Sequence, residues 1–90
     1  MRRRTYHFSG RVQGVGFRYT AQHLARGYPS LKGYVRNLPD GRVEMVVEGD
    51  DNDMEALVDS LKRHMDRKIE RIDLSKSKAA GDFPDFSIRH

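Results

Sequence analysis

The sequence predicts an α+β domain in which two helices cover one face of an antiparallel sheet. Three observations support this fold class. Apolar and polar residues alternate in several short segments, apolar residues recur at helical spacing in two longer ones, and glycine, proline and aspartate mark the boundaries. The elements follow in the order strand, helix, strand, strand, helix, strand, with a short further strand near the end.

The first half of the chain predicts a strand, a helix and a hairpin. Residues 5–12 alternate between apolar and polar side chains, as in a strand buried on one face. A helical pattern of apolar residues begins at Phe17. Residues 33–38 and 42–48 alternate again, and Leu38-Pro39-Asp40-Gly41 between them has the chemistry of a tight turn, because proline fixes φ and glycine permits positive φ.

The second half predicts a longer helix and two strands. Residues 50–53 offer aspartates suited to capping a helix N-terminus. Apolar residues at helical spacing then extend to about residue 67. Residues 69–74 favour a strand, although their apolar positions do not alternate strictly. Residues 76–84 are interpreted as a loop, and residues 86–88 as a short last strand.

This order of elements is typical of the ferredoxin-like β-α-β-β-α-β arrangement. We expect residues 1–90 to form one domain, since the chain is too short for two cores. The absence of cysteine excludes disulfides and thiolate chemistry. No apolar stretch follows the basic N-terminus or is long enough to cross a membrane, so we expect a cytoplasmic protein.

Positive charge is concentrated in the first part of the chain. Residues 1–39 contain eight Lys and Arg and no acidic residue, whereas residues 40–90 contain nine Lys and Arg and all 13 acids. The two parts therefore carry +8 and −4. Such a basic segment favours an anionic partner, but charge alone does not separate a small anion from a nucleic acid.

The most informative segment is Gly10-Arg11-Val12-Gln13-Gly14-Val15-Gly16-Phe17-Arg18, which joins the first strand to the first helix. Glycines allow successive N–H groups to turn inward around an anion, and a helix N-terminus adds positive potential. The segment lacks the Gly-Lys-Ser/Thr ending of a nucleotide P-loop, and Tyr19 stands where a dinucleotide fingerprint has its third glycine. From spacing alone, a phosphate site and a structural turn both stay open.

A second segment, residues 33–49, decides between these interpretations. Together the two segments resemble the two signatures of the acylphosphatase family. The first signature reads G-x-V-Q-G-V-x-F-R. The second reads, in order: glycine, an aromatic residue, a small apolar residue, a basic residue, Asn, any three residues, Gly, any residue, Val, any five residues and Gly. Residues 10–18 and 33–49 fit every fixed position, and residues 86–90 resemble the family's last strand. The resemblance covers nearly the whole chain and implies the same ferredoxin-like fold.

The sequence shows no obvious catalytic nucleophile, base or metal ligands. Hydrolysis of an acyl phosphate suits such a protein, because the carboxylate is a good leaving group and the reaction needs no strong nucleophile. We expect backbone N–H groups of the phosphate-binding loop to bind the phosphoryl oxygens, Arg18 to stabilise their charge, and Asn37 to hold the attacking water. The resemblance implies the same roles, a metal-free mechanism and no covalent enzyme intermediate. We also expect no cofactor, and a monomer that acts on a small acyl phosphate. The loop residues concerned are Gln13, Gly14, Val15, Gly16, Phe17 and Arg18.

Several residues are expected to be structural or electrostatic background. The histidines His7, His23, His64 and His90 show no metal-ligand spacing, and Phe8, Phe17 and Tyr34 are interpreted as core aromatics. Two other functions remain as alternatives. One is a nucleic-acid-binding module, because the RNA-recognition motif has the same element order and Lys32-Gly33-Tyr34-Val35 faintly resembles its aromatic signature. The other is a catalytically silent acylphosphatase-like domain.

Overall fold

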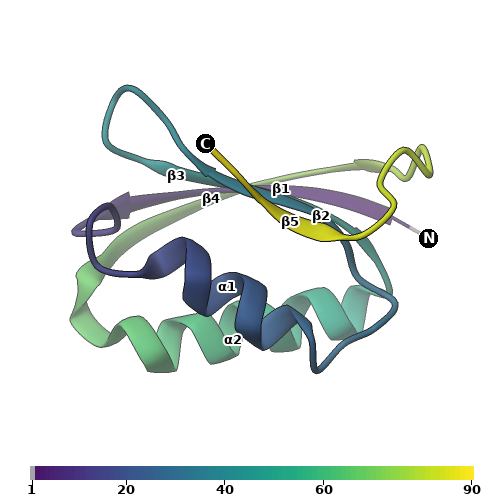
Figure 1. Cartoon of the computed structure of the whole chain (residues 1–90), viewed down its shortest axis with the longest axis horizontal. Coiled ribbons are helices and arrows are strands. Elements are labelled where there is room, and N and C mark those ends of the chain that lie inside the picture. The colour runs from purple at the N-terminus through teal and green to yellow at the C-terminus, as the bar shows by residue number, and fades with distance from the viewer. Residues whose placement is uncertain (1) are drawn as a thin grey trace.

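Two helices lie side by side on one face of a five-stranded sheet, and the other face is left without helices (Figure 1). The structure, a computed structural model, describes residues 2–90. Within this range, no helix is both long and apolar enough to cross a membrane. In chain order the elements are β1 (Arg2–Gly10), α1 (Phe17–Ala25), β2 (Lys32–Asn37), β3 (Val43–Gly49), α2 (Asp51–Met65), the 3-10 turn η1 (Asp66–Lys68), β4 (Ile69–Lys78) and β5 (Phe86–Arg89).

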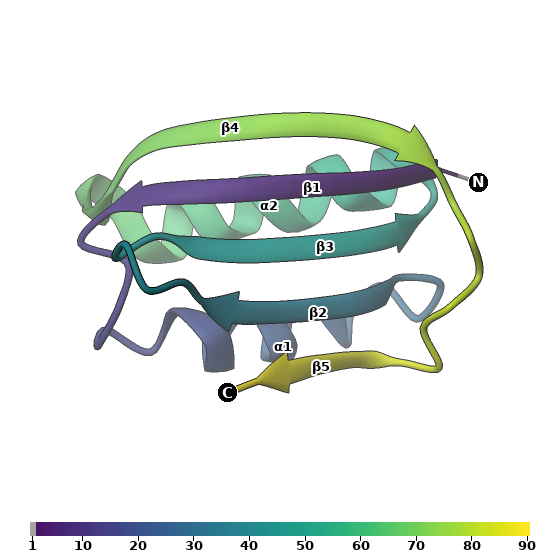
Figure 2. The ribbon, with the colours of Figure 1, turned by 90° about the horizontal axis from the view of Figure 1, so that it is seen from above.

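The sheet has the strand order β4-β1-β3-β2-β5 (Figure 2). The four long strands pair antiparallel, as the sequence predicts, but β5 pairs parallel to β2. The expectation of a purely antiparallel sheet is therefore wrong at one edge. The reason is topological: β4 runs opposite to β2, and the chain reverses once more before β5, so β5 must run in the direction of β2.

Strand β4 differs from its prediction in two ways. It continues through Lys78, because residues 76–78 pair with the start of β1, so only the second part of the predicted loop 76–84 is a loop. Its register also shifts between Ser9 and Gly10 of β1. This irregularity lets both Ile69 and Ile72 pack against the core although they are three residues apart, which explains the imperfect alternation in the sequence.

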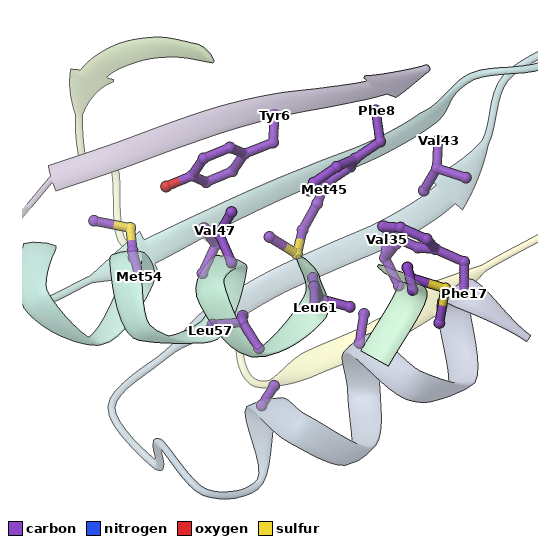
Figure 3. Close-up of a cluster of buried hydrophobic side chains, with 14 of the residues drawn as sticks. Tyr6, Phe8, Phe17, Val35, Val43, Met45, Val47, Met54, Leu57 and Leu61 are labelled. Carbon is purple, nitrogen blue, oxygen red and sulfur yellow. The ribbon is translucent and has the colours of Figure 1, made fainter. Parts of the chain in front are cut away.

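The core lies between the helices and the sheet (Figure 3). The rings of Phe8 on β1 and Phe17 on α1 meet with their centroids 4.8 Å apart, which fixes the start of α1 against the sheet. Helix α2 begins where predicted, since the Asp50 side chain accepts hydrogen bonds from two of its first amides. It ends at Met65, earlier than predicted, because Asp66 adopts a positive φ of 49°.

Tyr34 is not a core aromatic, which corrects the sequence interpretation. It lies on the uncovered face of the sheet, half-exposed, and its hydroxyl donates to Glu44 Oε1 at 2.9 Å. The Arg89 guanidinium lies 3.9 Å from its ring centroid, and Phe83 meets its edge at 5.8 Å. Tyr34 therefore anchors β5 and the β4–β5 crossover from outside rather than filling the core.

Candidate functional site

The loop between β1 and α1 depends on two glycines with positive φ. Gly14 has φ 73° and Gly16 has φ 79°. A Cβ atom at either position would meet nothing within 4 Å, so crowding does not require glycine there. The left-handed backbone does, because an L side chain in this region is strained. This conformation turns the loop from the end of β1 into the first turn of α1.

The N-terminus of α1 is left open, in contrast to that of α2. The N-cap of α1 is Gly16, which provides no side-chain cap, and its first turn contains no acidic residue. The first turn of α2 is capped by Asp50 and carries Asp51 and Asp53. Within residues 2–90, the loop and turn hydrogen bonds include none donated by the backbone amides of residues 13–18. The start of α1 therefore offers unpaired donors and positive potential to an anion.

The side chain of Gln13 joins this loop to the β2–β3 hairpin. Its amide nitrogen donates to the backbone oxygens of Leu38 at 2.8 Å and of Arg42 at 2.9 Å. From the sequence we expect Gln13 to contribute only its backbone to phosphate binding, and nothing in the sequence reveals which carbonyls its side chain would reach. The two bonds fix the loop next to the end of β2, where Asn37 lies.

A pocket of about 100 Å³ forms where the loop, the start of α1 and the end of β2 meet. Five of the seven expected site residues line it, together with Val12 and the exposed Tyr19; they are Gly14, Gly16, Phe17, Arg18 and Asn37. Gln13 and Val15 do not line it, since Gln13 bonds to the hairpin and Val15 packs against the core. Larger hollows occur elsewhere, including one of about 430 Å³ beside Arg4 and Leu74, so size alone does not single out this pocket.

The polar groups in the pocket suit anion binding. Arg18 is half-buried and permanently charged. The side-chain hydrogen bonds found within residues 2–90 include none from the Asn37 amide, which leaves this amide available to a ligand or water. No carboxylate, histidine or cysteine lines the pocket. Also within that range, no cluster of three or more His, Asp or Glu side chains could hold a metal ion.

Carboxylates on the neighbouring hairpin are paired with cations, which limits their repulsion of an anion. Asp40 accepts from Arg42 Nε at 2.8 Å, and hydrogen bonds from the Arg42 backbone and side chain lower the pKa of Asp40. Glu44 accepts from Tyr34 and from Arg36 Nε, the latter at 2.8 Å. Burial raises the pKa of Glu44, but its hydrogen-bonding partners more than offset this, and the net pKa is lowered.

His90 contacts Arg18, although the sequence does not identify His90 as a site residue. The Nη1 of Arg18 donates to Nδ1 of His90 at 3.2 Å, across 72 positions of sequence. From the sequence alone, His90 is interpreted as a surface or packing residue. No signal in the sequence predicts this contact, because it depends on β5 pairing parallel to β2 and ending beside the start of α1.

Comparisons with known proteins agree on one family. A sequence model of the acylphosphatase family matches residues 4–88. An acylphosphatase of Paenarthrobacter aurescens is 44% identical over 89 residues, which cover 96% of this chain and 92% of that protein. The crystal structure of acylphosphatase from Bacillus subtilis matches with a TM-score of 0.90 and 36% identity, covering all of both chains. The structure of HypF from T. kodakarensis matches with a TM-score of 0.83 and 34% identity, covering all of this chain and 12% of that one.

Proposed function

Because the chain belongs to the acylphosphatase family, and is thereby an acylphosphate hydrolase, we propose that its catalytic centre is the pocket formed by the β1–α1 loop, Arg18 and Asn37. The observation that carries this proposal is the uncapped N-terminus of α1, which opens into the same small pocket as an arginine and a free amide. Three kinds of hydrogen-bond donor converge there, and no anionic side chain competes with the substrate.

The phosphoryl group binds to the loop and to Arg18. Backbone N–H groups between Gln13 and Arg18 donate to its oxygens, and the dipole of α1 adds to their effect. The guanidinium donates two parallel hydrogen bonds and stabilises the negative charge that develops in the transition state. Pre-organised donors of this kind need no rearrangement during the reaction, which is why they lower the barrier.

Asn37 holds the attacking water opposite the leaving group. A bond forms between the water oxygen and phosphorus, the bond from phosphorus to the acyl oxygen breaks, and the carboxylate departs with the electron pair. The substrate's own phosphate accepts the water's proton, so the protein supplies no general base. Absence of carboxylates, histidines and cysteines from the pocket lining supports this division of roles. The reaction depends on position and charge rather than on a strong nucleophile.

The test is hydrolysis of benzoyl phosphate in the presence of EDTA by the intact protein and by Arg18→Gln and Asn37→Ala. Each variant should lose on the order of 100- to 1,000-fold in kcat, as when one transition-state donor is removed. Arg26→Gln, at the other end of α1, and Asn52→Ala, on α2, are matched controls that should keep full activity. Circular dichroism checks that all variants are folded.

The outcomes separate the parts of the proposal. No turnover by the folded, intact protein would reject this centre as an acylphosphatase site. Full activity in Asn37→Ala would reject the role of Asn37 in holding water while leaving phosphate binding intact. Turnover that requires an added divalent cation would reject the metal-independent mechanism.

The nucleic-acid alternative gains no support from the sheet face. Tyr34 is the residue on which the faint resemblance to the RNA-recognition motif depends, and such motifs stack bases on exposed aromatic rings. Here Arg89 lies over the ring of Tyr34, and its hydroxyl is bound to Glu44. A filter-binding titration against salt, with single-stranded RNA, tests this alternative directly, since binding through several phosphates would give a steep salt dependence.

A further inference from the structure

In the contact between Arg18 and His90, the chemistry of arginine fixes which group donates and which accepts. Arginine carries only donors, so the Nδ1 of His90 must be the acceptor in the 3.2 Å contact. To accept, Nδ1 must carry no proton, which leaves Nε2 as the only N–H group of the ring. A protonated imidazole would instead present a second donor and a like charge to the guanidinium. The contact thus places one N–H group of Arg18 against Nδ1 of His90.

Strand β5 carries His90 to this place and is fixed along its length. At its start, the Gly33 amide donates to the Asp85 oxygen at 2.8 Å. Near its end, Arg89 pairs with Arg36 in the parallel register, and its guanidinium lies over Tyr34. Figure 2 shows this strand entering at one edge of the sheet and ending on the side where the β1–α1 loop lies.

The crossover that precedes β5 is held by a buried carboxylate. Glu48 is 4% exposed although it lies on the face of the sheet without helices. It accepts from the backbone amides of Ala80 at 2.9 Å and Gly81 at 3.0 Å, and from Arg3. The path from β4 across to β5 is therefore tied to the sheet before the strand begins, so His90 is presented by a supported segment.

We propose that His90 is a positioning residue that holds the Arg18 guanidinium in its phosphate-binding orientation; this inference rests on the proposed function of Arg18. An arginine side chain has many rotamers, and fixing one before the substrate arrives reduces the entropy lost on binding. The contact uses one N–H of Nη1. The remaining N–H groups still allow a two-point contact with phosphate, so phosphate binding does not require the bond to His90 to break.

The experiment compares His90→Leu with His90→Asn. Asparagine places an acceptor oxygen close to where Nδ1 lies, whereas leucine keeps the bulk and removes the acceptor. His23→Leu, an exposed histidine on α1, is the matched control. The readouts are the dissociation constant of inorganic phosphate, by calorimetry, and KM and kcat for benzoyl phosphate. Both are measured near pH 8.

His90→Leu should weaken phosphate binding and raise KM by roughly five- to tenfold, as expected for losing one hydrogen bond to a charged group at a solvent-exposed site, with a smaller change in kcat. His90→Asn should recover most of the loss, and His23→Leu should show none. Unchanged or tighter binding in His90→Leu would overturn the inference, as would an equal loss in His90→Asn. If the intact protein neither binds phosphate nor turns over benzoyl phosphate, the proposed function fails instead.

Discussion

Replacing Gln13 by methionine removes two hydrogen bonds while keeping the length of the side chain. The bonds lost are those to the backbone oxygens of Leu38 and Arg42, at 2.8 and 2.9 Å. Both oxygens keep a backbone donor, since Leu38 accepts from Gly41 and Arg42 accepts from Leu38. No carbonyl is left without a partner, so the loss is the net value of two ordinary hydrogen bonds, about 1–2 kcal/mol.

For a chain of this size, such a loss should lower the melting temperature by roughly 5–15 °C. Activity should fall as well, because Gln13 connects the loop that carries Arg18 to the hairpin that carries Asn37. A displacement of about 1 Å between two groups acting on one substrate commonly reduces the rate by 10- to 100-fold. The reduction should appear in kcat/KM for benzoyl phosphate, measured well below the melting temperature of the variant.

Gln13→Glu provides a sharper version of the same test. It keeps the length but points an acceptor-only carboxylate at two carbonyl oxygens and adds negative charge beside the proposed phosphate site. Its melting temperature and kcat/KM should both be lower than those of Gln13→Met. If Gln13→Met unfolds at the same urea concentration as the intact protein and keeps full kcat/KM, the view that Gln13 holds the two halves of the site together is refuted.

Two further predictions concern backbone strain and pH. Gly16→Ala and Gly81→Ala should each destabilise the fold by about 1–2 kcal/mol in urea unfolding, since φ is 79° and 73° and space for Cβ is open at both; only Gly16→Ala should also lower kcat/KM, and equal activities would contradict this. Burial raises the pKa of Glu48, but hydrogen bonds from Ala80, Arg3 and Gly81 more than offset this, and the net pKa lies below 4.5. The carboxylate therefore stabilises the fold above about pH 4.5, and this contribution disappears as the pH falls through the lowered pKa. Between pH 7 and pH 3, the free energy of unfolding should thus fall less for Glu48→Gln than for the intact protein. An equal fall in the two proteins would contradict this role of Glu48.

Local patterns in the sequence were sufficient to predict the helices and the hairpin. Periodicity and capping residues predicted both helices and the hairpin, with bounds displaced by one or two residues. The resemblance to the two family signatures predicts that the glycine-rich loop and Asn37 share a site, and the structure brings Gly14, Gly16, Arg18 and Asn37 to one pocket. The secondary structure depends on short-range patterns and the site residues belong to fixed motifs, so both can be predicted from the sequence. The roles of Arg18 and Asn37 stay predictions until the variants are measured.

Only the tertiary structure decided the contacts between residues that are far apart in the sequence. The parallel pairing of β5, the outward position of Tyr34 and the register shift near Gly10 all depend on how strands meet, which a single strand's pattern does not specify. The same holds for the side chain of Gln13 on the hairpin and for His90 on Arg18. The sequence by itself determined which groups the β1–α1 loop and the end of β2 can offer to a ligand. The fold decided which side chains contact those groups, because these partners lie far away in the sequence and no local pattern predicts them.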